Sequence, residues 1–226
     1  MAEVTRRRAI TLETLAIGSL LLPSILAKIP GAAFAYAHVS VAQDVLSTVR
    51  YASYLGILIF VIWTSGDGFA TFGFRKADWW RLPGRVVLLH ILAWAPLVST
   101  LLLARSAPGG LRFMPPPTAL ADVVTVIDIV AASVVIQSIT FGYLMTRAEE
   151  LTGSIYGAVA ISAILFGLQT ISLRNFHALD ALLILGQGVC YAVAFALTRS
   201  IWPQILTLAV YLGCSHLIFL HVWTMR

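Results

Sequence analysis

Two adjacent glutamates at the end of a long apolar segment are the residues of this chain best suited to chemistry. Glu149 and Glu150 follow Arg147, and a second apolar run begins within a few residues. Ionisable groups beside hydrocarbon are costly, so an acidic pair there predicts a functional site by default. The pair also has a structural interpretation, because carboxylates in the first turn of the next helix would favour the positive end of its dipole. A retained polar cavity and helix-start capping are both consistent with the sequence.

The composition indicates a membrane protein. Of 226 residues, 59% are hydrophobic and only 11% are charged, and the mean hydropathy is +0.90. A soluble domain carries about 25% charged residues, so this chain is predicted to be a polytopic membrane protein with the lipid bilayer as its partner. The net charge of +5 does not indicate a nucleic-acid partner, because the basic residues lie in short loops, where positive charge sets membrane topology.

The apolar runs predict the fold class. A spanning helix needs about 20 apolar residues. Seven suitable runs lie at 10–36, 46–64, 85–105, 119–146, 155–173, 178–198 and 201–224. The first run contains Pro23 and Lys28, so we expect it to break, tilt or re-enter. Because no polar stretch is long enough to fold separately, residues 1–226 are predicted to form a single all-α domain, a polytopic membrane helix bundle with about seven transmembrane helices.

The distribution of basic residues predicts the orientation. With seven spans, the N-terminus and the 65–85 loop fall on the same side, and this side carries most of the arginines, including Arg6, Arg7, Arg8 and Arg75. The side with more Lys and Arg faces the cytoplasm. We therefore expect an integral protein of the bacterial inner (cytoplasmic) membrane with a cytoplasmic N-terminus.

The order of several motifs resembles a known family. The acidic pair is followed by a helix that ends in a Phe-Gly-Leu motif, by another helix, and by the turn Ser200-Ile201-Trp202-Pro203 into a last apolar helix. Earlier in the chain, Phe72-Gly73-Phe74-Arg75 precedes Trp79-Trp80. This pattern is similar to that of the CAAX protease and bacteriocin-processing (CPBP) family of intramembrane metalloproteases. The resemblance implies one CPBP-like transmembrane domain over 1–226, in which the motif-bearing helices converge on one interior region.

The resemblance also implies where the catalytic groups would lie. The first family motif is Glu-Glu-x-x-x-Arg, which Glu149 and Glu150 match, while Ser154 stands at the arginine position. The second motif is Phe-x-x-x-His, which Phe166 matches, while Thr170 stands at the histidine position. The acidic pair is thus predicted to be the remnant of a catalytic motif.

The third family motif, His-x-x-x-Asn or Asp, falls on Leu208 and Leu212. In the family a glutamate is thought to activate a water molecule, with histidines helping to hold a metal. A catalytic zinc has three protein ligands and one open position, and leucine offers no lone pair. The sequence therefore predicts no metal ligands and no cofactor.

Other histidines could in principle rebuild a metal site. His177 lies three residues before Asp180, and His216 lies five residues before His221. The first pair shares a helix face if that stretch is helical, whereas the second is about 140° apart around a helix and does not converge.

Two functions follow from these predictions. The first is a non-catalytic membrane protein on the protease fold, a scaffold, accessory or binding subunit for other membrane protein chains. The alternative is an active, CAAX-protease-like intramembrane metalloendopeptidase with altered ligands and a bound zinc ion.

Overall fold

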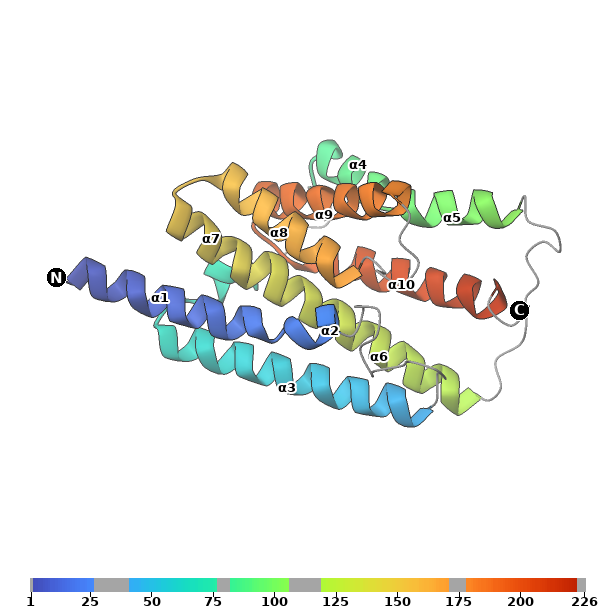
Figure 1. The fold of residues 1–226 in the computed structure, drawn as a ribbon, viewed down its shortest axis with the longest axis horizontal. Helices are drawn as coiled ribbons and strands as arrows, with labels where there is room; N and C mark the ends of the chain where they lie inside the picture. Colours follow the sequence, from blue (N-terminus) through green and yellow to red (C-terminus); the bar gives the residue numbers. More distant parts are fainter. Residues whose placement is uncertain (1, 27–40, 77–81, 106–118, 171–177, 223–226) are drawn as a thin grey trace.

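The computed structural model describes residues 2–26, 41–76, 82–105, 119–170 and 178–222 as helices with short connections, and it contains no strand within these ranges (Figure 1). In chain order the helices are α1 (Ala2–Ser19), α2 (Leu22–Leu26), α3 (Val41–Ser65), η1 (Phe69–Phe72), α4 (Gly84–Leu92), α5 (Ala95–Arg105), α6 (Ala119–Gln137), η3 (Ser138–Leu144), α7 (Met145–Thr152), α8 (Ile155–Thr170), α9 (Ala178–Thr198) and α10 (Trp202–Val222). The predicted all-α bundle is confirmed.

The helices correspond closely to the predicted spans. The run predicted at 178–198 is α9, and the run at 119–146 is a continuous path through α6, η3 and α7 that extends to Thr152. Three segments within the described residues are long and apolar enough to cross a membrane, namely 44–65, 123–152 and 178–198. Shorter apolar helices cover 84–99, 155–170 and 202–214. The chain is therefore an integral membrane protein.

Two predicted spans are broken, each beside a proline. Pro23 follows the turn between α1 and α2, and Pro96 follows the break between α4 and α5. A proline has no N–H to donate to the carbonyl four residues earlier, so the regular hydrogen-bond ladder stops there. The predicted break in the first span is confirmed at this point, and the rest of that span, with Lys28, lies outside the described residues.

Successive crossing segments alternate in direction along the bundle (Figure 1). Helices α8 and α10 run from the end that holds the N-terminus toward the opposite end, while α6 and α9 run back. The N-terminus and the loop after α3 lie at the same end, since Arg6 contacts Glu150 and Asp67 contacts Arg147. The predicted common location of these two segments is therefore confirmed, and the side of the membrane on which they lie stays a prediction.

The interior consists of two apolar clusters that share the α6–η3–α7 path. One contains Phe141, Phe166, Tyr191 and Leu208 from η3, α8, α9 and α10. The other joins α1 and α3 to η1 and to the opposite face of η3. The path α6–η3–α7 is thus the central element against which the remaining helices pack.

Polar groups add a specific link between α3 and α6. The hydroxyl of Thr125 donates to Asp44 at 2.8 Å, and the hydroxyl of Thr48 donates to Asp128 at 3.3 Å. Each bond joins one helix to the other. Interhelical hydrogen bonds of this kind fix the register of two helices in an apolar surrounding.

The π-helical stretch η3 allows a close backbone contact at Gly142. A Cβ atom added at this glycine would lie 2.7 Å from the carbonyl oxygen of Phe72 in η1. No flexible side chain can move away here, because the neighbour is backbone. Gly142 therefore lets the η1 loop lie directly on the central path.

We expect Gly142→Ala to lower the free energy of unfolding by about 1–3 kcal/mol, because the new methyl group overpacks a rigid contact. Gly186→Ala is the matched control, since nothing lies within 4 Å of its added Cβ. The control is expected to unfold like the wild type or up to about 1 kcal/mol later, as alanine favours a helix. Thermal unfolding of the purified proteins measures both, and equal midpoints would contradict the close contact.

Cysteines placed at Arg7 and at Lys76, in a chain whose two native cysteines are replaced by serine, are expected to react with an impermeant reagent from the same face of the membrane. The expected face is the cytoplasmic one, because basic residues gather at this end. Accessibility is measured in sealed vesicles and after their lysis. Labelling of the two positions from opposite faces would rule out the arrangement.

Candidate functional site

The acidic pair lies at the end of a helix and not at the start of one. Glu149 and Glu150 belong to α7, which ends where Gly153 takes a left-handed conformation with φ 67°. Helix α8 begins later, at Ile155, and has no acidic residue in its first turn. The helix-start interpretation of the pair is therefore wrong. Carboxylates at a helix C-terminus face the negative end of the dipole, so other groups must offset their charge.

Arg199 neutralises Glu149 with two hydrogen bonds. Its Nη1 and Nη2 atoms lie 2.6 and 2.7 Å from the two carboxylate oxygens. This side-by-side geometry is the strong form of an arginine–carboxylate pair. The hydrogen bonds from Glu149 raise the pKa of the Arg199 guanidinium above its ordinary value. Arg199 follows α9 and has a positive φ of 50°, so the backbone conformation between α9 and α10 aims this side chain at α7.

Arg147 is the centre of a larger ionic cluster. Its guanidinium lies 2.8 Å from Glu150, 2.8 Å from Asp67 and 3.4 Å from Glu13. These carboxylates belong to α7, to the loop after α3 and to α1. The side chain of Arg147 is only 2% exposed, whereas those of its partners are 28–33% exposed. One buried cation therefore holds three separate segments together.

Aromatic rings complete the surroundings of Arg147. Its guanidinium carbon lies 4.9 Å from the ring centre of Phe72 and 5.5 Å from that of Tyr143. The two rings are stacked with their centres 5.0 Å apart. The Tyr143 hydroxyl also donates to Glu13 at 3.3 Å. A cation over aromatic faces is stabilised by the ring quadrupoles, which offsets part of the cost of burying the charge.

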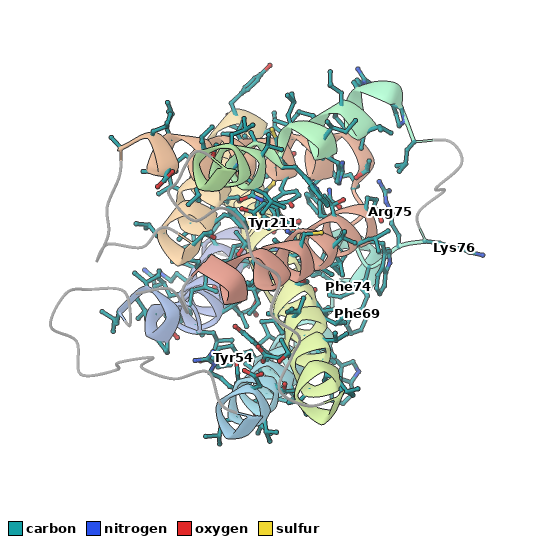
Figure 2. The ribbon with its side chains drawn as sticks, turned by 90° about the vertical axis from the view of Figure 1, so that its right-hand side faces the viewer. Tyr54, Phe69, Phe74, Arg75, Lys76 and Tyr211 are labelled. Carbon is teal, nitrogen blue, oxygen red and sulfur yellow. The ribbon has the colours of Figure 1, made fainter. Side chains whose placement is uncertain are left out.

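The loop after α3 brings further groups to this end of the bundle (Figure 2). Phe69 and Phe74 make an edge-to-face contact with ring centres 6.0 Å apart. Arg75 donates to the carbonyl of Thr198, and Ser200 donates to the carbonyl of Arg75 at 3.2 Å. The family-like stretch Phe72–Arg75 therefore packs against the turn into α10, while Trp79 and Trp80 lie outside the described residues.

The structure brings some predicted motif positions together. Phe166 and Leu208 are buried in the same apolar cluster, and Leu212 packs against it. Thr170 donates its hydroxyl to the carbonyl of Phe166 in its own helix at 2.8 Å. These positions converge, as the family resemblance implied.

The acidic pair does not lie at the level of Thr170. Helix α8 begins just after the pair and runs fifteen residues to Thr170, a distance of about 22 Å at the usual helical rise. The structure thus separates a charged end, which contains Glu149 and Glu150, from an interior that contains Phe166 and Leu208. The role of the pair as a catalytic remnant stays a prediction.

Three aromatic rings occupy the interior at this level. The ring centres of Phe141 and Phe166 are 5.7 Å apart, those of Phe166 and Tyr191 are 5.6 Å apart, and those of Phe141 and Tyr191 are 6.0 Å apart. The rings come from η3, α8 and α9. Tilted and edge-to-face pairs such as these stabilise a core beyond the area that they bury.

Neutral polar groups adjoin these rings, and the sequence analysis missed them. Gln137, four residues before Phe141, is fully buried, and Gln187, four residues before Tyr191, is 1% exposed. Because α6 and α9 run in the same direction (Figure 1), both glutamines lie one turn to the same side of the rings. Among the described residues, neither side-chain amide has a hydrogen-bond partner. The signal that could have revealed them is a glutamine inside an apolar span.

Gln169 occupies the same region from α8 and is fully engaged. Its amide donates to the hydroxyl of Thr140 at 3.1 Å and to the carbonyl of Leu165 at 3.0 Å. A buried polar atom without a partner costs about 1–3 kcal/mol, so Gln169 contributes stability that Gln137 and Gln187 do not.

The residues at the family's motif positions do not fit a zinc ion. Leu208 and Leu212 have no lone pairs, Thr170 is engaged with its own helix, and the two glutamates are bound to arginines. No group of three or more His, Cys, Asp or Glu side chains within the described residues could hold a metal ion. His177, with the side chains of His216 and His221, lies outside that part of the chain.

Replacing Arg147 by methionine is expected to lower the free energy of unfolding by about 3 kcal/mol, because three carboxylates lose their common cation. The matched control is Arg199→Met. It is expected to cost about 1 kcal/mol or less, because Arg199 is 36% exposed and solvent screens its ion pair. Unfolding monitored by tryptophan fluorescence compares the two. A loss for Arg147→Met no larger than that of the control would contradict the central role of this guanidinium.

Comparison with known families identifies the later part of the chain. Residues 119–211 match the family described as type II CAAX prenyl endopeptidase Rce1-like. The match starts at the first residue of α6 and ends within α10, so it includes the acidic pair, Phe166, Thr170 and Leu208. Comparisons with curated proteins and with solved structures gave no match. The predicted resemblance is confirmed, and the chain belongs to the Rce1-like group of the CPBP family.

Proposed function

We propose that this protein is a non-catalytic member of its family, an accessory, scaffold or binding subunit for other membrane protein chains in the bacterial inner membrane. The observation that carries this proposal is the engagement of both carboxylates of the acidic pair by arginines. Glu149 is bound by Arg199, and Glu150 by Arg147. A carboxylate that activates water or binds a metal needs an oxygen lone pair directed at that group.

The interior supports the same proposal. Where the family places histidine, this chain has Leu208 packed among aromatic and aliphatic side chains. The neighbouring polar groups are amides and hydroxyls, which neither carry a charge at neutral pH nor act as good zinc ligands. Several members of a catalytic constellation are thus replaced together, and the loss of one member alone usually reduces activity by orders of magnitude.

The ionic cluster supports a structural use of the acidic residues. Arg6 of α1 adds a further contact to Glu150 at 3.1 Å. Glu150 is therefore shared between Arg6 and Arg147, and through them it links α1 to α7. A glutamate in this position stabilises the charged end of the bundle, which suits a scaffold better than an active site.

The metal content of the purified full chain tests the proposal. We expect no stoichiometric zinc in elemental analysis and no cleavage of peptide substrates. The rival function, a metalloendopeptidase with altered ligands, predicts about one equivalent of zinc that is lost in Glu150→Gln or His177→Ala. Gln169→Leu is a control of comparable size outside the acidic pair. Zinc that disappears in either test variant but persists in the control would overturn the non-catalytic proposal.

A further inference from the structure

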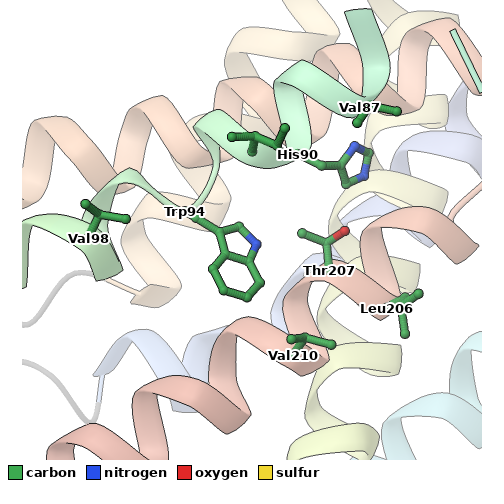
Figure 3. A pocket seen from close by; sticks show the side chains of 8 residues that line it. Val87, His90, Trp94, Val98, Leu206, Thr207 and Val210 are labelled. Carbon is green, nitrogen blue, oxygen red and sulfur yellow. The ribbon is translucent and has the colours of Figure 1, made fainter. Parts of the chain in front are cut away.

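A pocket of about 530 Å³ lies between the broken helix α4–α5 and α10 (Figure 3). Its walls are mostly apolar and include Val98, Leu206 and Val210, and its polar groups come from His90 and Thr207. The three apolar side chains are 44–54% exposed at the surface of the bundle. Since these helices are apolar membrane segments, the pocket opens to hydrocarbon. Its volume lies within the range of about 300–1,000 Å³ that is usual for small-molecule sites.

The chemistry of the pocket is set by one imidazole nitrogen. The Nδ1 atom of His90 lies 2.8 Å from the carbonyl oxygen of Val86. Because a carbonyl oxygen only accepts, Nδ1 carries the hydrogen, and Nε2 of the neutral ring is left as an acceptor. Among the described residues, the buried Nε2 atom has no hydrogen-bond partner. A ligand that satisfies it must therefore donate a hydrogen bond.

The neighbouring groups leave this acceptor to a ligand. The hydroxyl of Thr207 already donates to the carbonyl of Pro203 at 2.8 Å. The Tyr191 ring meets the His90 ring edge-on at 6.1 Å, and the Trp94 ring meets that of Tyr211 at 6.3 Å. These aromatic contacts brace His90 and Trp94. The pocket thus offers apolar walls and a single fixed acceptor.

We propose that this pocket binds a single-chain membrane lipid that carries a hydroxyl group. The hydrocarbon chain lies on the walls formed by α5 and α10, and the O–H donates to Nε2 of His90. A charged donor such as an ammonium group would lose its hydration in these apolar surroundings, whereas a hydroxyl is neutral and small. The proposal is independent of the role of Glu149 and Glu150, because the pocket contains neither.

The test uses the full chain in phosphatidylcholine nanodiscs and two photoreactive probes. One probe is hexadecanol with a diazirine in its chain, and the other is its methyl ether, which cannot donate a hydrogen bond. Crosslinked peptides are mapped by mass spectrometry. We expect the alcohol to label α4, α5 and α10 at the pocket about fivefold more than the ether, the usual effect of one net hydrogen bond.

Three variants make the test specific. His90→Leu should abolish the preference for the alcohol, whereas His90→Gln, which keeps an acceptor oxygen, should retain part of it. Val210→Trp should fill the pocket and reduce labelling by both probes. Ile161→Trp, at a position on α8 that is 40% exposed and outside the pocket, is the matched control and should label like the wild type.

The proposal is overturned if the wild type labels equally with both probes, or if the preference survives in His90→Leu. Labelling spread evenly over the exposed residues of α8 would also overturn it, as would crosslinks at this face to a second protein chain. Because the comparison of the two probes is made on the wild type, the result does not depend on whether any one variant folds.

Discussion

The charge of Arg147 must be balanced inside the bundle, and much of the structure follows from that requirement. A buried guanidinium without partners would be strongly destabilising, and here it contacts carboxylates from α1, from the loop after α3 and from its own helix. Each of these segments is therefore fixed relative to the central path α6–η3–α7. The same contacts leave Glu150 bound on both sides by arginines. One interaction thus determines both how the first third of the chain packs and which role the acidic pair can have.

Charge and neutral polarity are divided between two regions of the molecule. The charged end is built from arginines and carboxylates that come from loops and helix ends, where water is within reach. The interior beside Phe166 and Leu208 contains amides, hydroxyls and aromatic rings. An intramembrane hydrolase needs its charged groups in the interior, next to the scissile bond. In this chain the described ionic groups of the motif region lie at the end of the bundle, which favours a binding or structural role on an enzyme-derived fold.

The sequence predicted the helices far better than it predicted the site. The apolar runs indicated where helices lie because span length is set by bilayer thickness, and α9 agrees with its prediction at both ends. The break at Pro96 was not predicted, although proline chemistry explains it. Spacing alone placed Glu149 and Glu150 beside the next helix, but it could not show that Gly153 ends α7 first. The partners Glu13, Asp67 and Arg199 are 50 or more residues away, and no local pattern records such contacts.

The extra residue in the π-helical stretch η3 has a consequence for how this chain tolerates changes in length. Such stretches arise when one residue is added within an α-helix, and they are frequent at functional sites. Loss of that residue would restore a regular helix but would turn everything after it by about 100°. Arg147 would leave its carboxylates, and Glu149 would turn away from Arg199, although every one of these residues would still be present. The number of residues between Gln137 and Met145 is therefore as strictly constrained as the identity of the side chains in the ionic cluster.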